Sequence, residues 1–221
     1  MWQQVRDYFY QNMDTYLIAL KEHIWISIVT LGIAIVIGIP CGYLCVKYPK
    51  HQKWINGFFQ TLRIIPSLAI LILLIPVMGT GMKPAMTALV LLAVPPILMN
   101  TVTGLEEVPD FMLETARGIG MTEKQVVRRV CFPLAMPMIL TGIKTAFVEI
   151  IASATLAAKI GAGGLGGLIF TGLGLNRTDL LLIGGVSVAV VSILAGFLVE
   201  LLERRIMKYK YIHNKKGIFS Y

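Results

Sequence analysis

Hydrophobic residues along this 221-residue chain are grouped in long blocks rather than in amphipathic stripes. Five such blocks occur, at residues 24–46, 54–78, 84–102, 136–156 and 180–202. A helix needs about 20 predominantly apolar residues to cross roughly 30 Å of hydrocarbon, so each block is long enough to span a bilayer. The pattern predicts an all-α, polytopic membrane protein with about five transmembrane helices.

Prolines interrupt three of these blocks, at Pro40, at Pro66 and at the pair Pro95 and Pro96. In the interior of a soluble helix each would cost about 3 kcal/mol. Packed membrane helices tolerate proline, because neighbouring groups satisfy the backbone atoms that it leaves free. We therefore expect all five blocks to be spans.

The composition also indicates a bilayer. Hydrophobic residues make up 56% of the chain and charged residues 14%, whereas a soluble domain has about 25% charged residues. The net charge of +8 does not indicate a nucleic-acid partner, because the basic residues flank the apolar blocks. The three histidines lack metal-ligand spacing, and no phosphate-binding loop is present, so we expect this chain to bind no metal and no cofactor.

Lys and Arg are distributed unequally between the two sets of connections. One side holds thirteen of them, in residues 47–53, 117–129 and 204–216, whereas the other holds five, which are Arg6, Lys21, Lys83, Lys159 and Arg177. By the positive-inside rule the first side is cytoplasmic. The N-terminus is then outside and the C-terminus inside, as an odd number of spans requires.

This orientation divides the chain into three parts. Residues 1–22 are predicted to form an external amphipathic segment at the membrane interface. Residues 23–203 form the transmembrane domain, and residues 204–221 form a basic cytoplasmic tail.

The cytoplasmic connection at about 104–135 differs from the other loops. Gly118 and Gly120 interrupt it, and Thr122 followed by Gln125 is a capping box that begins a second short helix. Pro133 is expected to end that helix. Two short helices meeting at a glycine turn suit a protruding knob that another protein could approach closely. The residues alone leave this docking knob and a merely solvated basic loop open.

Within the same connection the sequence resembles the EAA loop of ABC importer permeases. The matching positions are Glu114-Thr115-Ala116, Gly120 and Val130-Cys131-Phe132-Pro133. The spacing fits throughout, whereas Thr115, Val130 and Phe132 depart conservatively from the consensus. In that family the loop is the coupling helix that docks on the cytoplasmic ATPase. The resemblance assigns ATPase coupling to Glu114, Thr115, Ala116, Gly118, Gly120, Thr122 and Pro133.

Further stretches, 63–69, 97–101, 154–158 and 160–166, resemble the osmoprotectant branch of these permeases. That branch imports glycine betaine, carnitine, choline and similar quaternary amines. A methionine-uptake branch shares the glycine-rich stretch, so a permease for another solute such as an amino acid is the alternative. Two further alternatives are an intramembrane enzyme and a membrane scaffold without transport. An enzyme would need paired acids or metal-spaced histidines within the spans, and a scaffold would not need the EAA spacing.

The resemblance implies the ABC transmembrane type-1 fold, a bacterial cytoplasmic-membrane location and several partners. An ABC ATPase dimer in the cytoplasm would use ATP and Mg, so this subunit is not an enzyme. An extracytoplasmic binding protein would deliver the small-molecule solute. Because the family works in pairs, a second copy or a similar permease would complete the path within the lipid bilayer.

Charged residues inside spans cost roughly 2.5–3.5 kcal/mol each, and Glu149 and Arg63 are two of these. Glu149 lies near the middle of the fourth block and either pairs with a neighbouring span or lines the solute path, where a carboxylate would suit a cationic amine. Arg63 either pairs internally or extends to the interface. The candidate path residues are Glu149, Arg63, Pro66, Ser67 and Asn100.

The last feature is a glycine-rich run at 161–174, which the orientation places outside. It is either a close-packed turn or a segment that shapes an external gate where the binding protein docks. The candidate gate residues are Gly161, Gly163, Gly164 and Gly166.

Overall fold

The computed structural model describes residues 2–206, which are mainly helical and contain no strand. The four long helices are α1 (Trp2–Lys47), α5 (Met82–Glu106), α8 (Phe132–Ala157) and α10 (Thr178–Ile206). The shorter helices are α2 (Pro49–Ile64), α3 (Ser67–Leu73), α4 (Ile75–Met78), α6 (Asp110–Gly118), α7 (Glu123–Val126) and α9 (Gly166–Gly174). A π-helical turn, η1 (Val127–Cys131), precedes α8, and a 3-10 turn, η2 (Ala158–Ile160), follows it.

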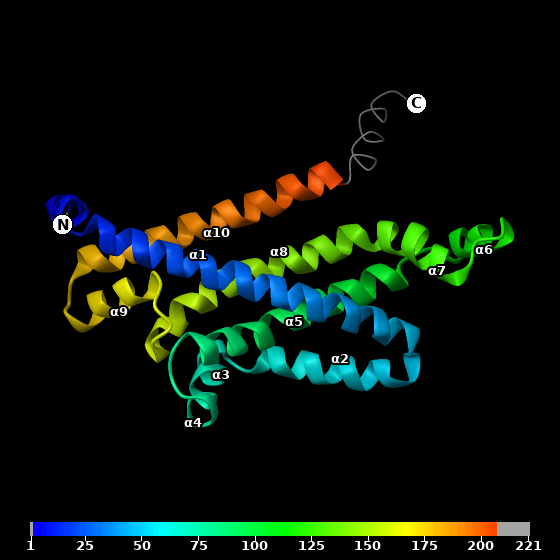
Figure 1. Ribbon diagram of the computed structural model, residues 1–221, viewed down its shortest axis with the longest axis horizontal. Coiled ribbons are helices and arrows are strands. Elements are labelled where there is room, and N and C mark those ends of the chain that lie inside the picture. The colour runs from blue at the N-terminus through cyan, green and yellow to red at the C-terminus, as the bar shows by residue number, and fades with distance from the viewer. Residues whose placement is uncertain (1, 207–221) are drawn as a thin grey trace, which may run out of the picture.

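The long helices run along the long axis of the molecule (Figure 1), with α6 and α7 at one end and α9 at the other. Four helices are long and apolar enough to cross a membrane, and the bent pair Gln52–Ile64 and Ser67–Met78 makes a fifth span if it is counted as one. The prediction of an all-α polytopic protein with about five spans is confirmed. The N-terminus lies at the α9 end, whereas α10 ends toward the α6–α7 end. Which end faces the cytoplasm stays a prediction.

The second block differs from a straight span, because its two halves meet at an angle of 96°. The break is at Pro66, and Ile65 before it is extended, with ψ of 124°. Proline disfavours a helical conformation in the residue that precedes it. Pro95 and Pro96, in contrast, lie inside α5 and are buried. We attribute the difference to packing, since Pro66 is exposed whereas Pro95 and Pro96 lie in the helix that packs against both α1 and α8.

The predicted external segment is continuous with the first span, because α1 begins at Trp2 and has a kink at Asn12. On the N-terminal side of this kink, Tyr8 is buried against Leu180 and Ile183 of α10. The segment is therefore packed on the bundle, and its location outside the membrane stays a prediction. Most of the predicted basic tail, residues 207–221, lies outside the described residues.

Helix α5 is the centre of the bundle and packs against both α1 and α8. Glycines allow the close approach: a β-carbon at Gly42 would lie 2.7 Å from Cβ of Thr101, and one at Gly142 would lie 2.8 Å from the Pro96 carbonyl oxygen. Small residues at such contacts are typical of membrane helix packing. Tight packing on both sides therefore holds α5 in place.

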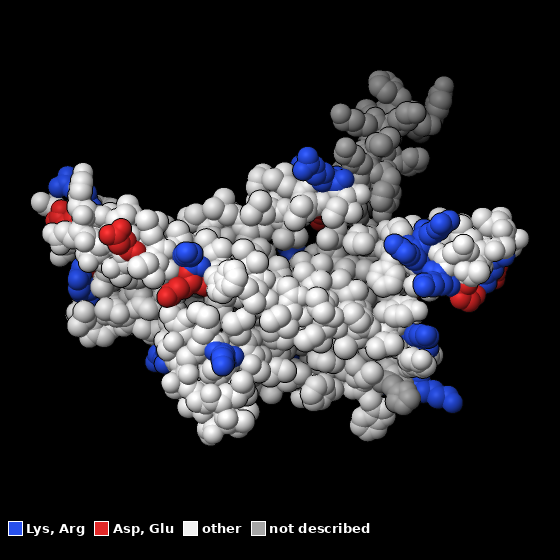
Figure 2. Space-filling model, in the orientation of Figure 1, with Lys and Arg blue, Asp and Glu red and all other residues white. Residues whose placement is uncertain are grey.

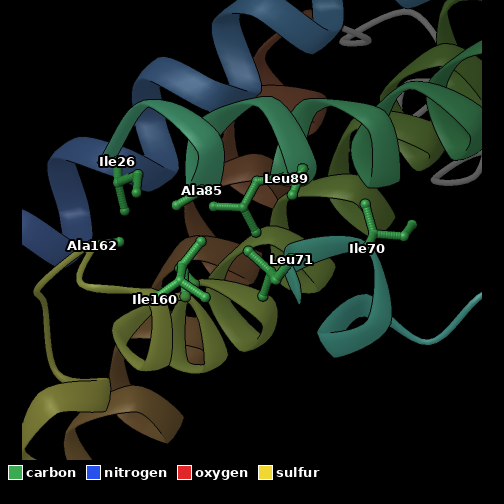
Figure 3. Close-up of a cluster of buried hydrophobic side chains, with 10 residues drawn as sticks. Ile26, Ile70, Leu71, Ala85, Leu89, Ile160 and Ala162 are labelled. Atoms are coloured by element: carbon green, nitrogen blue, oxygen red, sulfur yellow. The ribbon is translucent and has the colours of Figure 1, made fainter. Parts of the chain in front are cut away.

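A buried hydrophobic cluster fixes α3 on this core (Figure 3). Ile70 and Leu71 of α3 belong to the same cluster as Leu89 of α5 and Ile160 of η2. Because Leu71 is fully buried, α3 is anchored at its middle although the chain is broken just before it. The cluster thereby sets the position of Ser67, the first residue of α3.

Candidate functional site

Four of the five predicted path residues lie together around one cavity of about 330 Å³. Arg63, near the end of α2, and Glu149, on α8, form an ion pair with 3.6 Å between Nη2 and Oε1. Their side chains are 48% and 41% exposed in this single chain. The cavity is lined by Arg63, Ile64, Ile65, Pro66, Ser67, Leu92, Glu149, Ala152 and Ser153.

The break at Pro66 creates this cavity. It ends α2 just after Arg63 and starts α3 at Ser67, so the guanidinium and the Ser67 side chain line the same cavity. Ser153, which the sequence interpretation missed, also lines it. It follows Glu149 by one helical turn, and residues four apart lie on the same helix face, which was the available signal.

The contact between Arg63 and Glu149 is a charge contact rather than a hydrogen bond. A separation of 3.6 Å is longer than a hydrogen bond, so the contact is mainly charge attraction. The structure therefore shows the pairing that we considered for Glu149, and the path role stays a proposal.

Asn100, the fifth predicted path residue, lies elsewhere. Its side-chain nitrogen donates a hydrogen bond of 2.8 Å to the Pro96 carbonyl oxygen within α5. Its Cβ faces Gly142, where α5 and α8 are in close contact. Asn100 thus supports the packing of α5 around its prolines and does not line the Arg63–Glu149 cavity.

The predicted knob is formed by α6 and α7, which meet at Gly120. Gly120 has φ of +83°, and a β-carbon there would have no neighbour within 4 Å. Thr122 and Gln125 form the capping box: the Gln125 side chain accepts from the Thr122 N–H at 2.8 Å, and the Gln125 N–H donates to the Thr122 hydroxyl. The first short helix, the glycine turn and the capping box that begins the next helix are as predicted.

An ion pair joins the two helices of the knob across this turn. Arg117 of α6 donates two hydrogen bonds to the Glu123 carboxylate, the shorter of them 2.8 Å. The same contact raises the pKa of the Arg117 guanidinium. Ala116, at the third position of the EAA match, is buried. Phe111 and Ile119 are 64% and 71% exposed, which gives the knob an apolar surface.

Pro133 does not end the second short helix, so this expectation was wrong. The helix continues from Glu123 through to Ile160, and the π-helical turn η1 comes just before the proline. The N–H of Phe132 bonds to the carbonyl of Val127, five residues earlier. A π-turn is wider than an α-turn and gives room for the proline ring in the first turn of α8, a position that tolerates proline.

The predicted gate residues form a tightly packed turn between α8 and α9. Gly161, Gly163 and Gly164 have φ between 77° and 83°. The Gly164 N–H donates to the Glu22 carboxylate of α1 at 2.9 Å. A side chain at Gly163 would overlap that carboxylate. The close-packed turn is therefore present, and a gating role for it stays a prediction.

We expect Gly166→Ala to destabilise the protein, because a β-carbon there would overlap the Thr155 carbonyl oxygen. Overpacking of this kind costs about 1–3 kcal/mol. Gly167→Ala is the matched control, since nothing lies within 4 Å of its added carbon. Thermal unfolding in detergent should show a lower Tm for the first variant only. Equal Tm values would contradict the close packing of this turn.

Among the described residues no group of three or more His, Cys, Asp or Glu could hold a metal ion. A second ion pair within the bundle joins Lys144 of α8 to Glu200 of α10, at 3.8 Å. It lies on a different helix pair from Arg63 and Glu149.

Comparison with known proteins identifies the family. Residues 34–208 match the family described as "Binding-protein-dependent transport system inner membrane component". The chain belongs to this family. It is 39% identical over 199 residues to the carnitine transport permease protein OpuCB of Listeria monocytogenes, with 90% of this chain and 91% of the relative covered. It is 37% identical over 203 residues to the glycine betaine/carnitine/choline permease OpuCB of Bacillus subtilis (strain 168), covering 92% and 94%.

The fold of this family member has solved counterparts. The inward-facing MetNI methionine ABC transporter matches with a TM-score of 0.80 and 23% identity, covering 88% of this chain and 97% of the matched chain. An amino acid ABC transporter matches with a TM-score of 0.73 and 19% identity, covering 89% and 96%. These likenesses confirm the ABC transmembrane type-1 fold.

Family membership settles several of the predictions. The chain is a multi-pass permease subunit of an ABC importer in the cytoplasmic membrane, and it is not an enzyme. Its resemblance to the osmoprotectant branch is confirmed. Importers of this family need a partner ATPase that uses ATP, a solute-binding protein and a second permease.

Proposed function

We propose that this permease forms the path for a quaternary amine of the glycine betaine, carnitine or choline type. The observation that carries the proposal is the similarity to relatives named for these solutes, which extends over about nine-tenths of the chain. The methionine and amino acid transporters share the fold with this chain at 23% sequence identity or less. Identity that low indicates a common fold and does not indicate a common substrate.

The cavity at Arg63 and Glu149 is our candidate for part of the path. A quaternary ammonium group carries a permanent positive charge and has no N–H to donate, so a carboxylate can attract it only through charge. In this proposal the cation approaches Glu149 and takes the place of Arg63 beside it. Ser67 and Ser153 line the same cavity and offer hydroxyl groups to the solute's polar end.

Coupling to ATP is proposed to run through the knob of α6 and α7. Its exposed Phe111 and Ile119 supply an apolar surface, and Glu114 on α6 is also exposed. A cytoplasmic ATPase dimer would hold one knob from each permease and rock the spans between inward-open and outward-open states. An extracytoplasmic binding protein would deliver the solute, and the second permease would be another copy or a similar chain.

The test of the solute is uptake by cells that lack their own uptake systems. The permease would be expressed with its ATPase and binding protein and offered radiolabelled glycine betaine, carnitine, choline and methionine. We expect ATP-dependent uptake of at least one quaternary amine and none of methionine. Uptake of methionine alone would overturn the proposal and leave the amino acid alternative.

The proposed orientation gives a separate prediction. In a variant without its native cysteines, a cysteine at Thr80 should react with a membrane-impermeant maleimide in intact cells. One at Thr122 should react only after the membrane is opened. Both positions are exposed, so accessibility within the fold does not bias the result. The reverse labelling pattern would place the knob outside the cell and remove it from any cytoplasmic ATPase.

A further inference from the structure

A second, larger cavity of about 870 Å³ lies at the α6–α7 end of the bundle. It lies between the knob and the ends of the spans, and it is separate from the cavity at Arg63 and Glu149. Its lining comes from α1, α5, α6, α7, η1 and the first residue of α8. The lining residues are Tyr43, Val46, Lys47, Leu105, Leu113, Arg117, Glu123, Lys124, Val127, Arg128, Cys131 and Phe132.

The charged residues of this groove are mostly basic. Four cations and one carboxylate line it, and the carboxylate, Glu123, is already bound by Arg117. Within residues 2–206, neither Lys124 nor Arg128 forms an ion pair. Figure 2 shows Lys and Arg side chains gathered at this end of the molecule. The groove therefore presents unneutralised positive charge from Lys47, Lys124 and Arg128.

Apolar side chains form the other part of the groove. The rings of Tyr43 and Phe132 are in contact, with 5.9 Å between their centroids. Both rings pack on the buried cluster of Leu105, Ala135 and Ile139. A cavity with an apolar wall and a cationic rim suits a ligand that is itself apolar at one end and anionic at the other.

The position of the groove places it at the boundary between hydrocarbon and water. Lys47 is the last residue of α1, Leu105 is next to the last residue of α5, and Phe132 is the first residue of α8. A ligand here can extend its apolar part along the spans and keep its anionic part near Lys47, Lys124 and Arg128. The chain's own C-terminal segment, residues 207–221, carries four lysines and no acidic residue, so its charge does not suit this groove.

We propose that this groove binds an anionic phospholipid, with its phosphate between Lys47, Lys124 and Arg128 and its acyl chains against Tyr43 and Phe132. Basic pockets between membrane helices at a membrane surface bind anionic headgroups in this way. A lipid held there would contact α1 and the knob together. The inference depends on neither the solute nor the orientation, because the groove lies at the span ends in either case.

The test uses the purified full chain in detergent, titrated with dioleoylphosphatidylglycerol or dioleoylphosphatidylcholine and measured by native mass spectrometry. We expect the anionic lipid to bind more tightly. The double variant Lys124→Gln with Arg128→Gln should bind it about thirtyfold more weakly, the loss expected for two cations near a membrane surface. The matched control is Lys50→Gln with Arg129→Gln, which removes the same charge from exposed positions at the same end outside the lining.

The outcomes separate this site from general charge attraction. Equal loss in both double variants, or equal binding of the two lipids, would overturn the proposal. Displacement of the lipid by millimolar inorganic phosphate would overturn the lipid as the ligand and indicate a soluble anion. If the first variant is not monodisperse, Lys47→Gln with Lys124→Gln replaces it under the same criteria.

Discussion

Replacing Gly120 with Val should abolish solute uptake while the permease still inserts and folds. Gly120 has φ of +83°, which a β-branched residue adopts only at a cost of about 1–3 kcal/mol. The side chain itself meets open space, so the fold of the bundle is not blocked. The strain falls on the turn between α6 and α7, which we propose to dock on the ATPase. Uptake and pull-down of the ATPase would both be measured.

Gly57→Ala is the control for this variant. Gly57 lies inside α2, and nothing lies within 4 Å of its added β-carbon, so uptake should stay near normal. Glu114→Lys tests the docking surface without changing the backbone, and it should weaken the pull-down by reversing an exposed charge on α6. Normal uptake and normal ATPase association in both Gly120→Val and Glu114→Lys would refute the docking role.

Glu149→Gln should lower uptake of quaternary amines by about tenfold, the effect of roughly 1.4 kcal/mol on the rate-limiting step. The amide keeps the shape of the side chain and removes the charge that we propose to attract the solute. The measurement is uptake in proteoliposomes, normalised to folded complex. The solute's affinity for the separate binding protein should not change.

The charge swap, Arg63→Glu with Glu149→Arg, separates the path role from simple pairing. The swapped residues can form the same ion pair that now spans 3.6 Å, so the folded yield should recover relative to either single change. If the Glu149 position must be anionic for a passing cation, uptake by the swapped protein stays low. Recovery of uptake together with folding would show that the pair serves structure alone.

The spans and the knob were predictable from sequence because their signals are local. Blocks of apolar residues indicate the spans, and Thr122 with Gln125 marks the start of α7 within four residues. The consequence of each proline was not predictable in this way. Pro66 breaks a span whereas Pro95 and Pro96 do not, and the difference depends on contacts with other helices that no local pattern records.

The candidate site was only partly predictable for the same reason. Glu149 and Arg63 were both conspicuous as charges within apolar blocks, but their mutual contact joins residues 86 positions apart. Asn100 appeared equally suitable because it is polar within a span. Its side chain instead satisfies a carbonyl inside its own helix, and only the three-dimensional structure distinguishes these two uses.

The continuity of the helix from Glu123 to Ile160 has a mechanical consequence. At 1.5 Å per residue its 38 residues extend about 57 Å, with the knob at one end and Glu149 well along its length. A rotation of the knob about the axis of this helix would therefore turn the Glu149 carboxylate with it. The π-helical turn at Val127–Cys131 sets the rotation of the helix beyond it relative to the knob. Each residue added or removed there would rotate the Glu149 side chain relative to the knob by about 100°.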